Sequence, residues 1–152
     1  MIVAGTGILP FMDFLDLLLR IQLFKSLKKG KCETSVIQPL QDYDGIFNGA
    51  RFRLMCAFRS LEDFLGWEWI DKLAELSRID KEEFFECYCK IQETTTFLGI
   101  KKVSCQFNRE FLRGKVNAST SKFWICGPPK MQSDVFKELT DLGVNSNQIT
   151  YV

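Results

Sequence analysis

The sequence of 152 residues contains no histidine. Catalysis by a Ser-His-Asp or Cys-His arrangement is therefore excluded, and so is proton transfer by an imidazole. A zinc site without histidine would need four thiolates or carboxylates, and the six cysteines include no Cys-x-x-Cys pair. The sequence thus predicts no metal site and no catalysis of these types.

Long apolar runs and an excess of one charge are missing as well. The longest helix-like apolar stretch, residues 11–24, contains Asp13, Asp16 and Arg20, so it is too short and too charged to span a bilayer. The 20 basic and 19 acidic residues leave a net charge of +1, which gives no support for binding nucleic acid or a polybasic contact with a membrane. A short apolar strand and a glycine turn follow Met1 directly, so no signal peptide is expected.

The cysteines are typical of a protein from a reducing compartment. Cys56, Cys87 and Cys89 lie inside apolar runs, as reduced core thiols do. Without recognisable disulfide spacing, a secretory origin is not favoured. We therefore expect an intracellular location, in the cytoplasm or on the cytoplasmic side of a membrane.

Length and composition fit one globular domain, because 46% of the residues are hydrophobic and 26% are charged. Apolar runs typical of buried strands occur at residues 1–4, 52–58, 83–91, 123–126 and 149–152. Helical spacing of apolar residues occurs at 11–24, 65–76, 108–112 and 132–142. Residues 94–102 lack a regular pattern, and 103–107 are predicted to be a short extended piece. Alternating strands and helices predict an α/β fold with a doubly wound, five-stranded parallel sheet of the Rossmann-like type.

The first candidate site follows the strand at residues 1–4, where Gly5, Thr6 and Gly7 turn the chain. Glycines let a backbone approach a ligand closely, and a helix start offers free N–H groups to a phosphate. Thr6 adds a hydroxyl donor, and Pro10 fits the first turn of the helix that follows. The Gly-x-Gly-x-x-Gly fingerprint is incomplete, because Pro10 stands where the third glycine would be. A plain strand-to-helix turn is the alternative reading.

The second candidate site follows the strand at residues 123–126. Gly127 lets the chain turn, Pro128 and Pro129 fix a rigid path, and Met131 follows in the next helix. Cys126 ends the strand, where a small, soft side chain can pack against a flat ring. A buried thiol before a rigid turn is the alternative.

The third candidate is the pair Arg59 and Ser60, just after the second strand. In a dinucleotide site this position lies near the adenosine ribose, and an arginine there can pair with a 2′-phosphate. The alternative is a solvated arginine beside a helix cap, because Ser60 and Asp63 form a near match to a capping box. All three candidates lie at the carboxyl ends of strands, where ligands bind in doubly wound sheets.

In this order, these residues resemble the NAD(P)-binding domain of the ferredoxin–NADP⁺ reductase superfamily, which includes cytochrome b5 reductase-like and ferric reductase-like enzymes. The resemblance rests on residues 2–11, 54–76 and 142–151 and on the Cys-Gly-Pro-Pro-x-Met motif at 126–131. It covers most of the chain, so residues 1–152 are expected to form one pyridine-nucleotide-binding domain.

The resemblance implies a role for each candidate residue. Gly5, Thr6 and Gly7, with Pro10, would lie along the pyrophosphate and the nicotinamide. Cys126 would border the nicotinamide as the catalytic residue. The other cofactor-binding residues would be Arg59 and Ser60 at the adenosine end and Gly127, Pro128, Pro129 and Met131 beside the ring.

The implied function is transfer of a hydride from NADH or NADPH to a flavin, followed by release of electrons to an unknown acceptor. The family's flavin-binding barrel, which would hold FAD, precedes this domain and is expected on another domain or subunit. Ala4 stands where the family usually has a glycine, and residues 28–50 are a predicted insertion. These departures leave open a catalytically inactive interaction subunit as an alternative. A flavodoxin-like fold is a third possibility, which the Cys-Gly-Pro-Pro turn disfavours.

Overall fold

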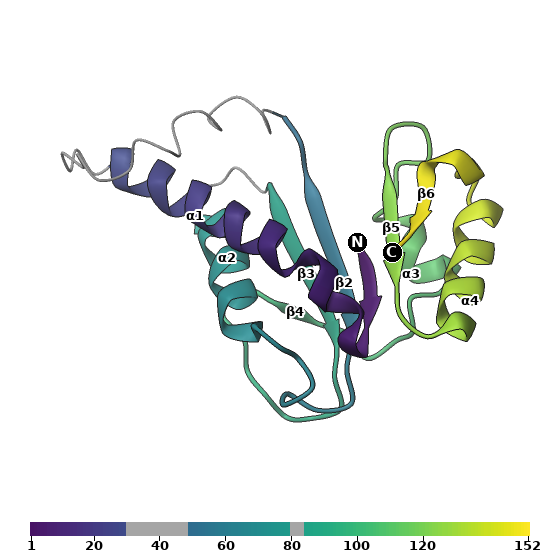
Figure 1. Ribbon diagram of the computed structural model, residues 1–152, viewed down its shortest axis with the longest axis horizontal. Helices are drawn as coiled ribbons and strands as arrows, with labels where there is room; N and C mark the ends of the chain where they lie inside the picture. Colours follow the sequence, from purple (N-terminus) through teal and green to yellow (C-terminus); the bar gives the residue numbers. More distant parts are fainter. Residues whose placement is uncertain (30–48, 80–83) are drawn as a thin grey trace.

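A computed structural model describes residues 1–29, 49–79 and 84–152 of the chain. A sheet of six parallel strands, in the order β4-β3-β2-β1-β5-β6, forms its centre (Figure 1). The strands are β1 (Ile2–Ala4), β2 (Phe52–Ala57), β3 (Phe85–Lys90), β4 (Lys101–Lys102), β5 (Phe123–Cys126) and β6 (Ile149–Tyr151). The helices are η1 (Gly5–Phe11), α1 (Met12–Lys29), α2 (Trp67–Ile79), α3 (Arg109–Arg113), α4 (Pro129–Asp141) and η3 (Ser146–Gln148), where η marks a 3-10 helix. The predicted insertion at 28–50 lies mostly outside the described residues.

The α/β class with a parallel sheet is confirmed, but the predicted count of five strands is wrong. The sixth strand is β4, whose two lysines are exposed and pair with Tyr88 and Cys89 of β3. The N–H of Val103 then donates to the carbonyl of Cys89 at 2.9 Å, and no strand forms at 103–107. Two lysines carry no apolar pattern, so this strand exists only because β3 offers it a free edge.

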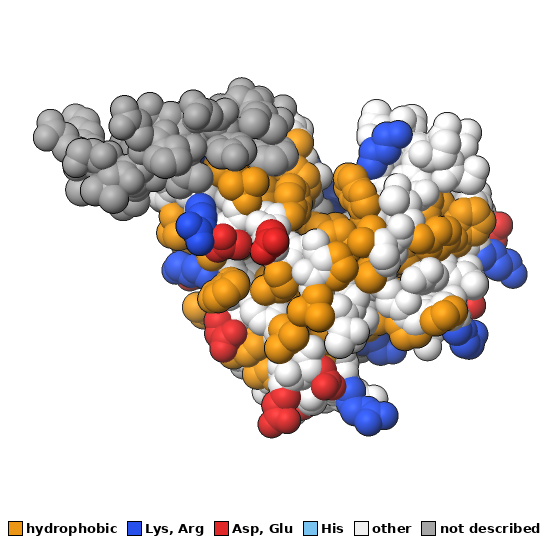
Figure 2. All heavy atoms as spheres, viewed as in Figure 1, with side chains coloured by type: hydrophobic (Ala, Val, Ile, Leu, Met, Phe, Trp, Pro, Cys, Tyr) orange, Lys and Arg blue, Asp and Glu red, His pale blue; other side chains and the backbone are white. Residues whose placement is uncertain are grey.

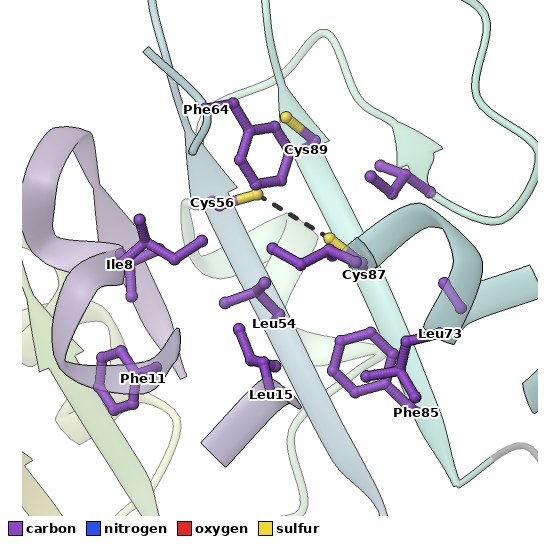
Figure 3. Close-up of a cluster of buried hydrophobic side chains, with 14 of the residues drawn as sticks. Ile8, Phe11, Leu15, Leu54, Cys56, Phe64, Leu73, Phe85, Cys87 and Cys89 are labelled. Carbon is purple, nitrogen blue, oxygen red and sulfur yellow. Dashed lines mark hydrogen bonds between the residues drawn. The ribbon is translucent and has the colours of Figure 1, made fainter. Parts of the chain in front are cut away.

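Helices cover both faces of the sheet, as a doubly wound fold requires. η1, α1 and α2 pack on one face, where Leu54 and Cys56 of β2 are fully buried (Figure 3). Met55, which lies between them in the strand, belongs to a second cluster with α3 and α4 on the opposite face. Adjacent strand residues point to opposite faces, so β2 serves both cores.

The three thiols in the centre of the sheet are core groups. Cys56, Cys87 and Cys89 are fully buried and free, and the Sγ atoms of Cys56 and Cys87 lie 3.9 Å apart (Figure 3). Burial, and then the hydrogen bonds among these thiols, raises the pKa of Cys56 well above its ordinary value. Its thiol therefore stays protonated and is a poor nucleophile.

One buried carboxylate joins α2 to the loop that precedes β4. Asp71 accepts the backbone N–H groups of Leu98, Gly99 and Ile100 at 3.0, 2.8 and 2.9 Å. The loop lies so close to the helix that a Cβ on Gly99 would come within 2.2 Å of the backbone nitrogen of Glu75. The three hydrogen bonds thus hold the approach to β4 against α2.

Within the described ranges, no helix combines the length and the apolar character that a membrane span needs. The same residues contain no group of three or more cysteine, aspartate or glutamate side chains placed to hold a metal ion.

Candidate functional site

The winding of the sheet changes direction at β1, which lies between β2 and β5. Val3 pairs with Cys56 on one side and with Cys126 on the other, and Ala4 pairs with Ala57. The carboxyl ends of these three strands are therefore level. In open α/β sheets, ligands bind at this edge, at the point where the winding reverses.

The first candidate segment continues from β1 without a separate turn. Gly5 has a φ of +54° and begins η1, and Thr6 is exposed at the edge. The prediction that Pro10 lies in the first turn of a helix is wrong, because η1 already begins at Gly5 and Pro10 lies inside it, before α1 begins at Met12. The chain thus presents one tightly wound 3-10 helix where the motif predicted a turn and an α-helix start.

The first and second segments are in direct backbone contact through Gly7. A Cβ on Gly7 would lie 2.3 Å from the carbonyl oxygen of Cys126 and 3.1 Å from the nitrogen of Gly127. Those atoms are backbone, so they cannot swing away as a flexible side chain would. A glycine at position 7 is therefore required for the two segments to meet.

The second segment is fixed by its own helix. Pro128 precedes α4 and Pro129 is its first residue, and both are exposed. The side chain of Met131 reaches back over Gly127, where a Cβ would come within 2.4 Å of its methyl group. The side-chain amide of Gln132 donates to the carbonyl of Gly127 at 2.8 Å. Sequence reasoning missed Gln132, although a long polar side chain in the first turn after Gly127 is a signal for such a clamp.

Ala4 and Cys126 lie where the first and second candidate segments cross, next to Gly7 and Gly127. Cys126 is half-buried, and its side chain packs against the core under η1, α1 and α2. A Cβ added to Gly127 would lie 3.3 Å from the backbone nitrogen of Ala4 and 3.4 Å from its Cβ. α4 begins next to this crossing, so the positive end of its dipole faces the same edge.

The third candidate lies at the same edge, after β2. Arg59 is exposed, and no other described residue pairs with its guanidinium. The prediction that Ser60 caps a helix is wrong, because α2 begins only at Trp67. Instead, the N–H of Ser60 donates to a carboxylate oxygen of Asp63 at 3.3 Å. A carboxylate suits a ribose 2′-hydroxyl and an arginine suits a 2′-phosphate, and both groups are present here.

Solved structures with a similar fold include domains of two larger proteins. The cytochrome b5 reductase domain of Ulva prolifera nitrate reductase matches all of this chain with a TM-score of 0.60 at 15% identity. The CS-b5R domains of human Ncb5or, in the NAD⁺ form, match 99% of it with a TM-score of 0.59 at 19% identity. The chain has the fold of part of a cytochrome b5 reductase domain.

This reductase-like fold agrees with the fold that the sequence resemblance implied. The chain spans 47% of the first structure and 35% of the second, so it corresponds to less than half of either protein. No protein-family model matches the sequence, and no curated protein matches it either. At these identities the likeness shows the fold alone.

Proposed function

We propose that this chain is the NAD(P)H-binding domain of a flavin-dependent oxidoreductase, with FAD held by a separate domain or subunit. The observation that carries the proposal is the contact of Gly7 with Cys126 and Gly127. It joins the two segments expected to bind the two halves of a dinucleotide, at the edge where such sheets bind ligands. The reductase-like fold supports the same assignment.

In this proposal the backbone of Gly5, Thr6 and Gly7 runs along the pyrophosphate, and the hydroxyl of Thr6 adds a donor. Pro10 stiffens η1 behind them, and the start of α4 contributes its positive dipole end. The pyrophosphate would thus be bound by backbone N–H groups, a hydroxyl group and a helix dipole. None of these changes its protonation state on binding, which suits a chain without histidine.

Cys126 would contact the nicotinamide, on the surface formed by Gly127, Pro128, Pro129 and Met131. When bound, the nicotinamide supplies the hydride and the partner's flavin accepts it. The residues of this chain orient the ring and exclude water, and Cys126 contacts the ring without exchanging a proton. The partner domain would determine the electron acceptor, and the free buried thiols fit a reducing compartment.

Titration calorimetry with NADH and with NADPH tests the proposal, because the domain should bind at least one of them. Arg59→Gln should weaken NADPH binding at least tenfold and leave NADH binding unchanged, since a hydrogen bond to a charged group contributes roughly 1.5–3 kcal/mol. Arg113→Gln, an exposed arginine at the end of α3, is the matched control. Absence of heat and of thermal stabilisation with both nucleotides would refute the assignment.

One observation favours the alternative of an inactive interaction subunit. The side chain of Ala4 lies at the crossing of the two segments, beside Gly127, where the family usually has a glycine. Its methyl group takes up space next to the proposed ring site. Reduction of an electron acceptor after addition of a flavin-binding reductase domain would exclude this alternative, and Ala4→Gly should increase nucleotide affinity if the methyl group obstructs the site.

A further inference from the structure

The outer side of α1 and α2, near the start of both helices, carries exposed apolar side chains. Trp69 of α2 is 54% exposed, Leu65 in the preceding loop is 48% exposed, and Leu9 of η1 is 50% exposed. Figure 2 shows hydrophobic and acidic side chains in the same area at the lower left, where α2 and the loop below it lie. Exposed apolar groups that gather in one place are typical of a surface that contacts another molecule.

Contacts between the two helices bring these side chains together. Gly66, with a φ of +70°, lies so close to α1 that a Cβ there would come within 2.4 Å of the methyl group of Met12. The same Cβ would lie 3.8 Å from a ring carbon of Trp69. The N–H of Met12 donates to the carbonyl of Leu9. The result is one apolar surface, here called the α1–α2 patch and formed by Leu9, Met12, Leu65 and Trp69.

A shallow groove between α1 and α2 continues the patch. It is lined by Met12, Leu15, Asp16, Trp69, Ile70 and Leu73. The groove has no room for a water molecule, so a small ligand would find no pocket there. A partner must instead cover the groove from outside, as an amphipathic helix does when it lies along a groove on a protein surface.

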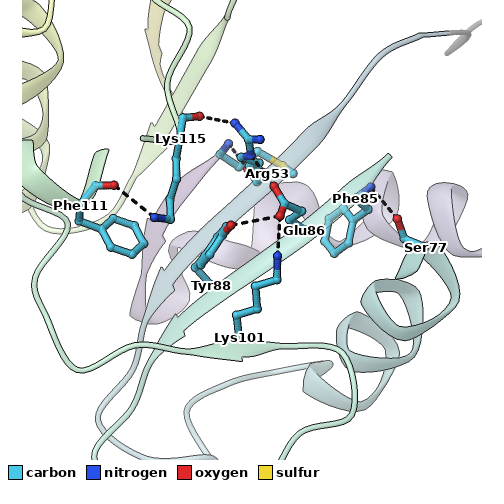
Figure 4. Close-up of polar contacts among 9 residues, drawn as sticks. Arg53, Ser77, Phe85, Glu86, Tyr88, Lys101, Phe111 and Lys115 are labelled. Carbon is cyan, nitrogen blue, oxygen red and sulfur yellow. Dashed lines mark hydrogen bonds and ion pairs between the residues drawn. The ribbon is translucent and has the colours of Figure 1, made fainter. Parts of the chain in front are cut away.

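Exposed carboxylates surround the patch. They are Asp13 on α1, Glu62 and Asp63 in the loop before α2, and Glu68 on α2. Within the described ranges, none of these four has an ion-pair partner. Glu86, on the opposite face of the sheet, differs in this respect, because its two carboxylate oxygens each lie 2.6 Å from a cation (Figure 4).

The cations near the patch do not neutralise these carboxylates. Arg20 of α1 pairs with Asp16 at 2.7 Å, and Lys72 of α2 pairs with Glu75 at 2.8 Å. Arg59 is the one cation in the loop at 58–66, against the two carboxylates of that loop. The patch therefore carries an excess of negative charge.

We propose that the α1–α2 patch is a docking surface for a protein partner that presents an amphipathic helix with basic flanks. The apolar side of this helix covers Trp69 and Leu65, and its lysines and arginines face the four carboxylates. Tryptophan is enriched among the residues that dominate binding energy, and the flexible side chain of Met12 adapts to the partner. Opposite charges orient the partner as it approaches.

The same carboxylates argue against two other occupants. An anionic membrane would be repelled, and a second copy of the chain on the same surface would bring like charges together. The proposal does not rest on the proposed function, because it involves no bound nucleotide.

The probe for the test is a labelled amphipathic peptide of about 18 residues, five helical turns, with leucines on one face and lysines on the other. Fluorescence anisotropy should show saturable binding of one peptide per chain, weakened at least tenfold when salt is raised to about 0.5 M. A counterpart peptide with glutamate in place of every lysine should not bind.

Two pairs of variants locate the binding. Trp69→Ala should weaken it at least tenfold, whereas Trp124→Ala, which removes an exposed tryptophan on β5, should bind as the unmodified chain does. Asp13→Asn/Glu68→Gln should weaken binding and reduce its dependence on salt. Its matched control is Glu110→Gln/Asp134→Asn, which removes exposed carboxylates on α3 and α4 and should change neither.

Absence of peptide binding to a chain that circular dichroism shows to be folded would overturn the proposal. So would equal binding of the glutamate peptide, or equal affinity in Trp69→Ala and Trp124→Ala. Vesicles of phosphatidylcholine with phosphatidylglycerol test the membrane, and sedimentation of the chain alone tests self-association. Vesicle binding or dimer formation that Trp69→Ala abolishes would assign the patch to that occupant and refute the docking of a basic helix.

Discussion

The variant Gly7→Ala tests the contact on which the proposed site depends. Its new Cβ would lie 2.3 Å from the carbonyl oxygen and 2.7 Å from the carbonyl carbon of Cys126. A separation below 3.0 Å forces a shift, so η1 and β5 must move apart by about 0.7 Å or more. β1 and β5 pair only through Ile2 with Ile125 and Val3 with Cys126, and the second pair lies beside the clash. Overpacking of this kind costs roughly 1–3 kcal/mol, and we expect the upper half of that range because only backbone can give way.

Urea unfolding measures the loss of stability, and titration calorimetry measures the loss of nucleotide affinity. We expect the free energy of unfolding to fall by about 2–3 kcal/mol with an unchanged slope, and the affinity to fall at least tenfold. Gly114→Ala is the control, because Gly114 has a φ of −81° and a Cβ there meets nothing within 4 Å. If Gly7→Ala and Gly114→Ala have the same free energy of unfolding and the same nucleotide affinity, the two segments are not in contact and the proposed site is wrong.

Three further predictions follow from the described contacts. Asp71→Ala should lower the free energy of unfolding by about 3 kcal/mol, because it leaves the backbone N–H groups of residues 98–100 without an acceptor. Urea unfolding measures this loss, with Asp134→Ala at an exposed position as the control. A loss below about 1 kcal/mol, no larger than that of the control, would contradict the prediction. Burial alone would raise the pKa of Glu86, but its contacts with Lys101 and Arg53 outweigh burial and lower that pKa to about 2. The stabilisation by Glu86 should therefore be complete above pH 4.5, its ordinary pKa, and disappear as the pH falls to about 2. Denaturant titration across that range should show that the difference in free energy of unfolding between the unmodified chain and Glu86→Gln shrinks in acid. A difference that is constant with pH would refute this prediction. A thiol reagent should label the exposed Cys105 at once and reach Cys56, Cys87 and Cys89 only on unfolding, and label found on any of these three in the native chain by mass spectrometry would show that the core is open.

Several features of the fold follow from local sequence patterns. The run at 123–126 predicts β5 with its observed bounds, because a short apolar segment that ends in Gly-Pro-Pro has few other conformations. Pro129 begins α4, and Gly143, with a φ of +88°, follows its end, as proline and glycine do at helix ends. The alternation of such strands and helices was enough to predict a parallel sheet and to place all three candidate segments at one edge.

The errors in the prediction occur where a distant part of the chain decides the local structure. Lys101 and Lys102 form a strand only because β3 has an edge to pair with. Ser60 and Asp63 carry a capping pattern, yet the helix starts later, at Trp67. Pro10 fits a helix start by itself, but it lies within the 3-10 helix whose Gly7 packs against β5.

The sequence by itself determined the fold class, the direction of the strands and the two glycine segments, since these depend on apolar periodicity and on backbone freedom within a few residues. Only the tertiary structure decided that Gly7 touches Cys126 and that Lys101 and Lys102 form a sixth strand beside β3. The contact of Gly7 with Cys126 depends on the register of β1 against β5, which is set by packing between segments more than 50 residues apart in the chain.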